Sequence, residues 1–280
     1  MKIASLQPSV SIVLDRLGCL DAPGAPDAPV SLVACTRHCI DAVPALRTRP
    51  VAVVRDSWST SADELLAVRP DLVIASVPYR RESLEAILKA GCPVLALAPH
   101  SLADIEQDIR LIAAVAGAPS RAEPVIAAMR NAIAEIRRRS APLAPRPRVY
   151  CEEWGKPPIH SQLWVRELVE AAGGVFVGQP GATTTLQAVA AADPDVVIAS
   201  WCGAGDRVPL EKIAARPGWE RMRAVREGRV CCIADELLNT PAPTLVGGLE
   251  ALAAALHPDH FPAPGGLRWL APNPSTVQCV

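Results

Sequence analysis

The chain has 280 residues, of which 50% are apolar and 20% charged, and its formal net charge is −1 at pH 7. This composition predicts a folded globular protein with room for two domains. Because neither sign of charge forms a long run and no apolar run is long enough to cross a bilayer, we expect no nucleic-acid partner and no membrane insertion.

The N-terminal part alternates short apolar runs with amphipathic stretches. Helical spacing and good helix formers predict helices at 61–68 and 81–90. Ser9 and Ser101 stand where helix N-caps occur, and Asp104 completes a capping box with Ser101. Strands are predicted around these helices at 3–6, 30–34, 72–76 and 94–98. This alternation indicates a parallel sheet covered on both faces.

Two features bear on the compartment. Met1-Lys2 leads directly into the first apolar run, without the basic segment, long apolar core and cleavage site of an export signal, so we expect a cytoplasmic protein. The nine cysteines are odd in number and most stand in apolar runs. They predict buried free thiols rather than disulfides, which agrees with that location.

The middle of the chain differs from both ends. A single apolar stripe with charges opposite predicts a long helix over 120–139. The stripe consists of Val125, Ile126, Met129, Ile133 and Ile136. A proline-rich segment at 140–147 ends the helix. Such a helix between two α/β parts acts as a stiff connector.

A second set of α/β elements follows. Strands are predicted at 148–151, 175–177, 196–200 and 229–233. Helices are predicted at 165–172, 186–192, 210–215, 219–223 and 244–256. The remainder after residue 257 is rich in Pro and Gly and is expected to be irregular.

The two α/β parts repeat one motif. Residues 65–76 (LLAVRPDLVIAS) and 189–200 (VAAADPDVVIAS) agree at seven of twelve positions and lie 124 residues apart. That period is too long for a solenoid repeat, so it indicates two lobes of one design. Because ligands bind in clefts between such lobes, we expect the binding site there.

Six segments occur in the order found in one known family. They are residues 5–9 (SLQPS), 63–72 (DELLAVRPDL), 153–174, 192–196 (ADPDV), 216–230 and 245–252 (LVGGLEAL). Through them the chain resembles, from residue 2 to about 260, the cobalamin/iron-siderophore class of ABC-transporter substrate-binding proteins. It is most similar to the cobalamin-binding branch, in particular to members without a signal peptide. The resemblance implies the class III substrate-binding-protein fold, with two Rossmann-like three-layer α/β lobes joined by one long helix.

The resemblance also implies the domain plan and the function. The lobes would be residues 1–118 and 148–257, joined by the helix and its proline-rich stop at 119–147 and followed by a tail at 258–280. The implied function is non-catalytic binding of a corrinoid such as cobalamin in the cleft, as a transporter-type binding protein or a cytoplasmic carrier. We expect a monomer without a catalytic cofactor. The sequence has no GxGxxG, Walker A, nucleophile-elbow or HExxH motif, which agrees with a protein that is not an enzyme.

Members of this family tend to carry one acidic residue per lobe that docks onto arginines of a membrane permease. The register places the first at Asp63, with Glu64 beside it. The second falls near Asn239, which is neutral, although Asp235 and Glu236 are close. The sequence therefore leaves open whether an ABC-transporter permease is a partner.

Ligands of doubly wound lobes bind beyond the carboxyl ends of the strands. Aromatic faces at these positions could cover the apolar plane of a corrin ring, and indole N–H groups could reach its amides. Trp58, where the resemblance places a stacking aromatic, could instead anchor its loop on its own lobe, whereas Trp219 is expected in the core. The ligand-binding candidates are Pro8, Ser9, Cys39, Trp58, Tyr79, Glu153, Trp154, His160, Trp164, Trp201 and Cys202.

Metal binding is an alternative. Cys35, His38 and Cys39 could bind a soft metal, although no second cysteine pair supplies further ligands for zinc. The histidines His38, His100 and His160, with a carboxylate, could hold a divalent metal, or one of them could be an axial ligand of a corrinoid cobalt.

Two further alternatives concern the cargo and the chemistry. Arg37, Arg80 and Arg81 could meet the anionic groups of an iron-siderophore. A chelatase acting on a tetrapyrrole would need a metal ligand and a general base, for which the candidates are His38, His160 and Glu153.

Overall fold

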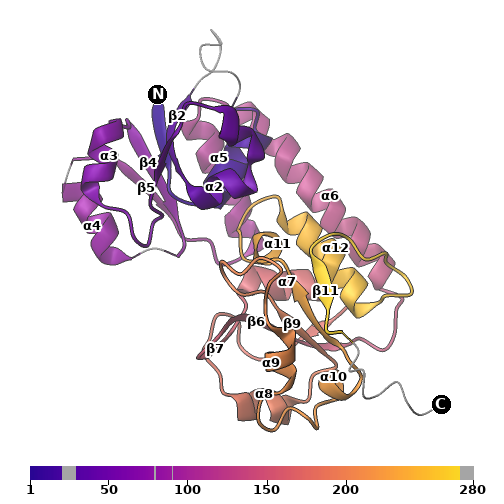
Figure 1. The fold of residues 1–280 in the computed structure, drawn as a ribbon. Helices are drawn as coiled ribbons and strands as arrows, with labels where there is room; N and C mark the ends of the chain where they lie inside the picture. Colours follow the sequence, from indigo (N-terminus) through magenta and orange to yellow (C-terminus); the bar gives the residue numbers. More distant parts are fainter. Residues whose placement is uncertain (21–29, 79, 90, 272–280) are drawn as a thin grey trace. The chain divides into compact units, whose positions relative to one another are not determined.

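The computed structural model describes residues 1–20, 30–78, 80–89 and 91–271 (Figure 1). Tyr79, a predicted ligand contact, lies outside the described residues. The chain divides into two compact units. Unit 1 comprises residues 1–129 and 241–243, and unit 2 comprises residues 130–240 and 244–280.

Unit 1 contains a five-stranded parallel sheet with the strand order β3-β2-β1-β4-β5. The strands are β1 (Lys2–Ser5), β2 (Ser31–Thr36), β3 (Ala52–Val54), β4 (Leu72–Ser76) and β5 (Val94–Leu97). Most side chains of β1 and β4 are buried, as expected for a parallel sheet covered on both faces. The four predicted strands are confirmed, and β3 is an additional short one.

Helices cover both faces of this sheet. They are α1 (Pro8–Arg16), α2 (Arg37–Ala42), α3 (Ala62–Val68), α4 (Arg81–Lys89) and α5 (Leu102–Val115), with short 3-10 turns η1 (Pro44–Thr48) and η2 (Pro119–Arg121). Leu65 of α3 and Ile87 of α4 pack with Ala4 and Leu6 on one face. The helix α1 packs with α2 and α5 instead, and Figure 1 shows α3 and α4 on the side of the sheet opposite α2 and α5.

Local signals decide where two of these helices begin. Ser101 Oγ accepts the backbone N–H of Asp104 (3.2 Å), and Asp104 Oδ2 accepts that of Ser101 (2.9 Å), so the predicted capping box is confirmed. Ser9 is not an N-cap, and this prediction was wrong. The helix α1 already starts at Pro8, because the fixed φ of proline suits the first helical position, and Gln7 is the N-cap.

One long helix, α6 (Ala122–Ser140), runs from residues of unit 1 into residues of unit 2. Four members of its predicted apolar stripe are buried, namely Ile126, Met129, Ile133 and Ile136. The predicted helix is therefore confirmed. Among the described residues, no helix combines the length and the apolar character that crossing a bilayer requires.

Unit 2 contains a sheet with the strand order β11-β10-β9-β6-β7, in which β8 also pairs with β6. The strands are β6 (Arg148–Gly155), β7 (Pro158–His160), β8 (Val175–Phe176), β9 (Val196–Ala199), β10 (Val230–Ile233) and β11 (Leu267–Trp269). The pairs β6–β8, β6–β9 and β9–β10 are parallel, whereas β7 and β11 run antiparallel to their neighbours. The strand β11 lies in a segment expected to be irregular.

The helices of unit 2 are α7 (Leu163–Ala171), α8 (Leu186–Ala192), α9 (Leu210–Ala214), α10 (Arg223–Arg226), α11 (Asp235–Leu238) and α12 (Leu245–Leu256). α7 packs against α12, and α12 packs against α11. Gly248 allows the second contact, because a Cβ there would lie 2.1 Å from Leu237 O. α8 and α9 pack around Tyr150 and Trp219 in a separate core cluster.

The two copies of the sequence repeat form the same local structure. Residues 65–76 contain the end of α3 and β4, and residues 189–200 contain the end of α8 and β9. Both helices end on a residue with a left-handed backbone, Arg69 (φ 46°) and Asp193 (φ 41°).

The strand that pairs with each copy is also equivalent. Ala4 of β1 lies opposite Val73, and Tyr150 of β6 lies opposite Val197, the matching position of the repeat. This register makes Leu6 equivalent to Glu152, Gln7 to Glu153, Val77 to Trp201 and Pro78 to Cys202.

Candidate functional site

The strand order of unit 1 singles out one end of the sheet. β1 lies between β2 and β4, and the helices that follow β1 and β4 cover opposite faces. Such a topological switch point leaves space for a ligand, because the loops at the carboxyl ends of the two strands diverge. We call residues 7–9 and 77–78 the unit 1 switch point. Gln7 Nε2 donates to Pro78 O across it (3.0 Å).

Trp58 lies in a tight loop beside the unit 1 switch point. Asp56 Oδ1 accepts the Trp58 N–H (3.1 Å), and the preceding Ser57 N–H donates to Leu6 O (3.3 Å). The Trp58 side chain is 53% exposed, and the Arg80 guanidinium lies 6.0 Å from its ring centroid. The indole is therefore accessible to a ligand and is not packed into its own unit.

The other predicted residues of this region divide by burial. Pro8 is partly exposed at the start of α1, whereas Ser9 is buried in the first turn. Cys39 is fully buried, and its Sγ accepts a hydrogen bond from Thr36 Oγ1 (3.2 Å). Because α2 begins immediately after β2, it turns Cys39 inward. The thiol cannot touch a ligand at the surface, so the predicted ligand contact of Cys39 is wrong.

The Cys35, His38 and Cys39 side chains do not converge. Cys35 is buried, which together with the neighbouring Cys39 raises the pKa of its thiol to about 12, whereas His38 is exposed. Throughout the part of the chain that the structure describes, no three His, Cys, Asp or Glu side chains are grouped as a metal site would require.

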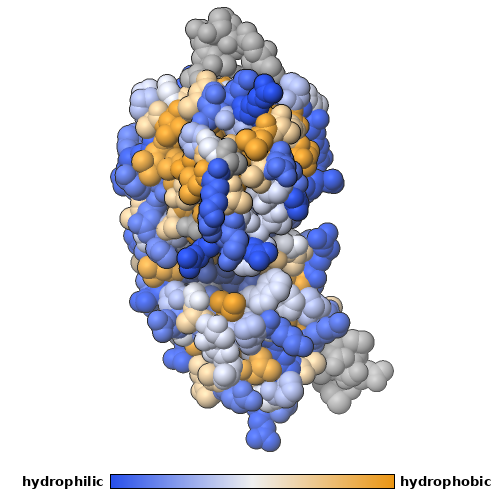
Figure 2. Space-filling view, turned by 90° about the vertical axis from the view of Figure 1, so that its left-hand side faces the viewer, coloured by the Kyte–Doolittle hydropathy of each residue, from blue (hydrophilic) through white to orange (hydrophobic). Residues whose placement is uncertain are grey.

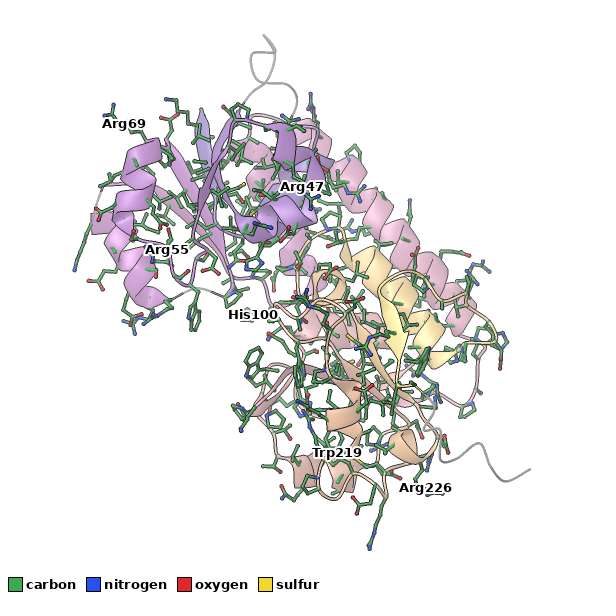
Figure 3. All side chains as sticks on the ribbon, in the orientation of Figure 1. Arg47, Arg55, Arg69, His100, Trp219 and Arg226 are labelled. Carbon is green, nitrogen blue, oxygen red and sulfur yellow. The ribbon has the colours of Figure 1, made fainter. Side chains whose placement is uncertain are left out.

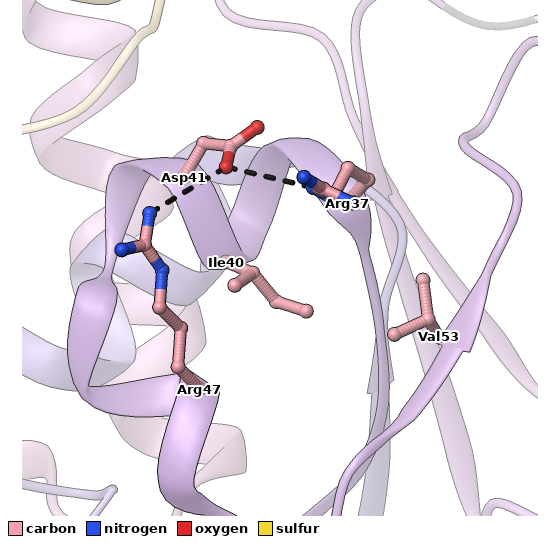
Figure 4. Close-up of a pocket in the computed structure, with 5 residues that line it drawn as sticks. All are labelled: Arg37, Ile40, Asp41, Arg47 and Val53. Atoms are coloured by element: carbon pink, nitrogen blue, oxygen red, sulfur yellow. Dashed lines mark ion pairs between the residues drawn. The ribbon is translucent and has the colours of Figure 1, made fainter.

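A separate hollow in unit 1 lies between α2, η1 and the edge strand β3 (Figure 4). Ile40 and Val53 form apolar walls, and Arg37 and Arg47 share Asp41 at N–O distances of 3.6 and 3.8 Å. All three charged side chains are more than half exposed, so water screens them. The hollow lies at the β2–β3 edge, away from the unit 1 switch point.

Exposed apolar side chains also occur on the helices of unit 1, for example Leu66 on α3 and Leu88 on α4. Figure 2 shows apolar groups interspersed with charged ones on the surface. Scattered apolar side chains are normal on protein surfaces and do not indicate a binding site.

Unit 2 has a switch point at the equivalent place, between the carboxyl ends of β6 and β9. The helix α7 packs with α12, whereas α8 packs around Tyr150 in the other cluster. We call residues 153–154 and 200–202 the unit 2 switch point. Cys202 N donates to Glu153 O across it (3.3 Å), which keeps the two segments side by side.

Four polar side chains meet at the unit 2 switch point. Gln162 Nε2 donates to Glu153 Oε2 (2.6 Å), and the Cys202 thiol lies 3.7 Å from Glu153 Oε1. Asn239 Nδ2 lies 3.6 Å from Cys202 Sγ and donates to Ser200 O (2.5 Å). Burial raises the pKa of Glu153, and burial together with the Glu153 charge raises that of Cys202 to about 12, so the thiol is neutral at pH 7.

Two buried oxygen atoms of this cluster have no hydrogen-bond partner among the described residues, namely Ser200 Oγ and Asn239 Oδ1. A buried polar atom without a partner costs free energy. Because both atoms are buried, neither is accessible to a ligand at the surface.

The predicted tryptophans of unit 2 lie in different surroundings. Trp154 is 45% exposed, and its Nε1 donates to Lys156 O (3.1 Å). Trp201 is partly exposed next to it in the unit 2 switch point. Trp164 is only 3% exposed, and its Nε1 donates to Leu238 O (2.8 Å). Trp164 is thus a core residue, because α7 directs it inward with Val165.

The histidines do not form a shared site either. His160 is 5% exposed, packs edge-on against Tyr150 at 5.2 Å, and has a buried Nδ1 without a partner among the described residues. Burial lowers its pKa, opposed by the Glu152 charge. His100, labelled in Figure 3, is an exposed residue of unit 1 before α5. His160 is therefore not accessible as a metal ligand, as the metal-site and chelatase alternatives require.

Sequence reasoning missed Glu152. Its carboxylate is buried and paired with Arg216, at 2.6 Å from Nη1 and 2.8 Å from Nη2. Trp219, labelled in Figure 3, lies under the Arg216 guanidinium at 4.7 Å. The available signal was the length of β6. Had the strand been extended to residue 155, alternation would have turned Glu152 to the same side as Tyr150.

The two residues predicted for permease docking lie in the first turn of α3. Asp63 is exposed. Glu64 accepts hydrogen bonds from Arg55 N (3.1 Å) and Arg55 Nε (2.6 Å). Burial alone would raise the pKa of Glu64, but the hydrogen bonds and charge of Arg55 lower it below its usual value. Asp63 is therefore the more available carboxylate.

The model of one protein family, described as periplasmic binding protein, matches residues 3–237. The chain belongs to the periplasmic binding protein family. An uncharacterized ABC transporter substrate-binding lipoprotein, YvrC of Bacillus subtilis, is 24% identical over 93% of this chain and 81% of its own length. A cobalamin-binding protein of Halobacterium salinarum is 24% identical over 77% of this chain, which spans 61% of that relative.

A solved structure supports the fold. A periplasmic heme-binding protein of Pseudomonas aeruginosa superimposes with a TM-score of 0.79 at 22% identity, covering 97% of this chain and 98% of its own. The predicted α/β class III fold is confirmed. Family membership places the chain among non-catalytic substrate-binding proteins, while the cleft between the lobes stays a prediction.

Proposed function

We propose that this protein binds a corrinoid, such as a cobalamin, without transforming it. The proposal depends mainly on one observation: accessible indoles, Trp58 in unit 1 and Trp154 and Trp201 in unit 2, lie beside the two switch points. Aromatic faces can cover the apolar plane of a macrocycle.

The polar groups at the unit 2 switch point suit the neutral periphery of a corrinoid. They are a carboxyl group, two amides and a neutral thiol, from Glu153, Gln162, Asn239 and Cys202. Partly exposed groups such as the Gln162 amide and the Glu153 carboxyl can bond to the acetamide and propionamide side chains of a corrin. An anionic ligand would instead be recognised by arginine or lysine.

Similarity to known proteins supports a corrinoid as the ligand and indicates heme as the main alternative. The Halobacterium salinarum relative is named a cobalamin-binding protein. The Pseudomonas aeruginosa structure that shares the fold is a heme-binding protein. Heme has a flat ring with anionic propionates. A site built for heme would therefore offer cationic side chains, whereas a site built for a corrinoid would offer groups that bond to neutral amides.

The test is a spectral titration of the purified protein with cyanocobalamin, with hemin and with a ferric hydroxamate siderophore in parallel. We expect a saturable one-to-one change with cyanocobalamin and weaker binding of the other two. Saturable binding of hemin or the siderophore without any response to cyanocobalamin would overturn the proposal.

Two further parts of the proposal concern place and partner. The Bacillus subtilis relative supports a role beside an ABC transporter, for which Asp63 is the exposed carboxylate on α3. A cytoplasmic location stays a prediction from the sequence, and fractionation of the native cells followed by immunoblotting would test it.

A further inference from the structure

The buried ion pair of unit 2 ties a surface residue to the interior. Glu152 Oε1 accepts the Trp201 indole N–H (2.9 Å) and the Arg216 Nη2 group (2.8 Å). Glu152 Oε2 accepts the Tyr150 hydroxyl (2.8 Å) and the Arg216 Nη1 group (2.6 Å). With four donors on two oxygens, the carboxylate is fully satisfied and has one defined orientation.

Arg216 is itself held in place. Its side chain is 11% exposed, and its guanidinium stacks over Trp219, a fully buried residue whose Nε1 donates to Leu186 O (3.1 Å). Arg216 and Trp219 belong to the segment Arg216-Pro217-Gly218-Trp219. That segment contributes to the family resemblance. Because Arg216 is mostly buried and Trp219 fully buried, direct contact with a ligand does not explain why these two residues are present.

The fold does not require this ion pair. The equivalent position in unit 1 is Leu6, which is fully buried in the apolar cluster with Ala4 and Leu65. A buried ion pair is generally no more stabilising than well-packed apolar side chains, since desolvation offsets the attraction. Unit 2 therefore keeps Glu152 and Arg216 for a reason other than completing the sheet.

The difference at the surface supplies that reason. In unit 2, Trp201 is bonded to Glu152, whereas the position of unit 1 equivalent to Trp201 is Val77. Gly155 leaves room for this ring, because a Cβ there would lie 2.3 Å from Trp201 Cζ2. The indole is thus held at its N–H by Glu152 and at its six-membered ring by the backbone of Gly155.

We propose that Glu152, held by Arg216, is a positioning residue that fixes the Trp201 indole as a preformed binding face of the unit 2 switch point. This inference rests on the proposed function, in which a corrinoid contacts Trp201. A fixed indole loses no rotamer freedom when the ligand binds, so more of the contact energy appears as affinity. The role is one of orientation, and Glu152 itself does not touch the ligand.

The first arm of the test needs no ligand. Exchange of the six tryptophan indole N–H protons with solvent is measured by NMR on the full chain, with the Trp201 signal assigned from Trp201→Phe. We expect Glu152→Gln and Arg216→Lys to speed exchange at Trp201 roughly tenfold or more, because the N–H loses its fixed acceptor. Trp164, bonded to Leu238 O, is the internal control and should not change.

The second arm measures the Kd for cyanocobalamin. Trp201→Phe keeps an aromatic face but removes the bond to Glu152, and Gly155→Ala displaces the ring without changing any charge. We expect each to weaken binding roughly three- to tenfold. Tyr150→Phe removes one hydrogen bond from the same carboxylate while leaving the indole bond, so its effect should be clearly smaller.

The outcomes separate this inference from the function on which it rests. Unchanged exchange at the Trp201 N–H in both Glu152→Gln and Arg216→Lys would overturn the inference. So would faster exchange in those two variants if Trp201→Phe and Gly155→Ala leave the Kd for cyanocobalamin unchanged. If Glu152→Gln does not fold, Arg216→Lys and Gly155→Ala decide. A parent protein that binds no corrinoid, yet shows the expected exchange changes, would refute the proposed function and keep Glu152 as the residue that orients Trp201.

Discussion

At equivalent positions beside the two switch points, unit 1 has Leu6 and Val77, and unit 2 has Glu152 and Trp201. The frame around these positions is the same in both units. Asp71 Oδ2 accepts the N–H of Lys2 (2.6 Å), and Asp195 Oδ2 accepts that of Arg148 (2.7 Å), at matching places of the repeat.

The comparison separates two roles of sequence. Residues that the units share, such as Asp71 and Asp195, hold strands together and serve folding. Residues that differ, such as Leu6 and Glu152, change the surface that each unit offers to a ligand. We expect substitutions in the first group to affect stability alone, and those in the second to affect binding as well.

The largest effect is expected from Glu152→Ala. It leaves Arg216 buried without its partner, so the free energy of unfolding should fall by about 3–5 kcal/mol, measured by urea denaturation. The matched control is the double variant Glu152→Leu with Arg216→Met, which gives unit 2 the apolar character of unit 1. That protein should regain most of the lost stability but bind cyanocobalamin more weakly, and parental affinity in it would contradict our comparison.

Next in size is the loss of the accessible indole of unit 1. Trp58→Ala should weaken corrinoid binding by roughly 1–3 kcal/mol, because an aromatic face is removed. Its unfolding midpoint should hardly change, since the side chain is exposed. Leu88→Ala, an exposed apolar residue of α4, is the matched control and should bind as the parent does. Equal affinities of parent and Trp58→Ala would remove Trp58 from the site.

A smaller effect tests the shared frame. Asp71→Asn and Asp195→Asn each weaken one hydrogen bond to a backbone N–H, which should cost about 1 kcal/mol of stability. Asp195 also pairs with Arg223, so its substitution should cost somewhat more. Neither variant should change the Kd for cyanocobalamin. A stability loss in only one unit would show that the repeat is not structurally equivalent.

The smallest effect is a pH dependence at Glu153, which is equivalent to Gln7. Burial raises the pKa of Glu153 in the folded protein, so the folded state binds this proton more tightly than the unfolded chain. The resulting stability is fully present below the unfolded pKa of about 4.3 and is lost as the pH rises through the folded pKa.

Glu153→Gln removes this loss. Its unfolding midpoint, relative to the parent, should therefore rise as the pH is increased from about 4 to 8. The reverse change in unit 1, Gln7→Glu, is the matched control and should make stability fall over the same range. A difference between Glu153→Gln and the parent that does not vary with pH would contradict the assignment.

The sequence alone determined the architecture, because its signals are local. Alternating apolar runs and helical stripes predicted the α/β fold, the stripe ending at Ile136 predicted α6, and Ser101 with Asp104 predicted a cap. The repeat also predicted two parts of one design. Each of these signals depends on residues that lie within a few positions of one another.

Only the tertiary structure decided which chemistry-bearing residues reach a surface. Trp164 and Cys39 matched the strand-end rule but face the interior. Glu152, which no sequence pattern singled out, holds the buried ion pair. The partner of Glu152 is Arg216, 64 residues further along the chain. No local pattern encodes such a contact, because which side of a strand is buried, and against what, depends on how distant segments pack.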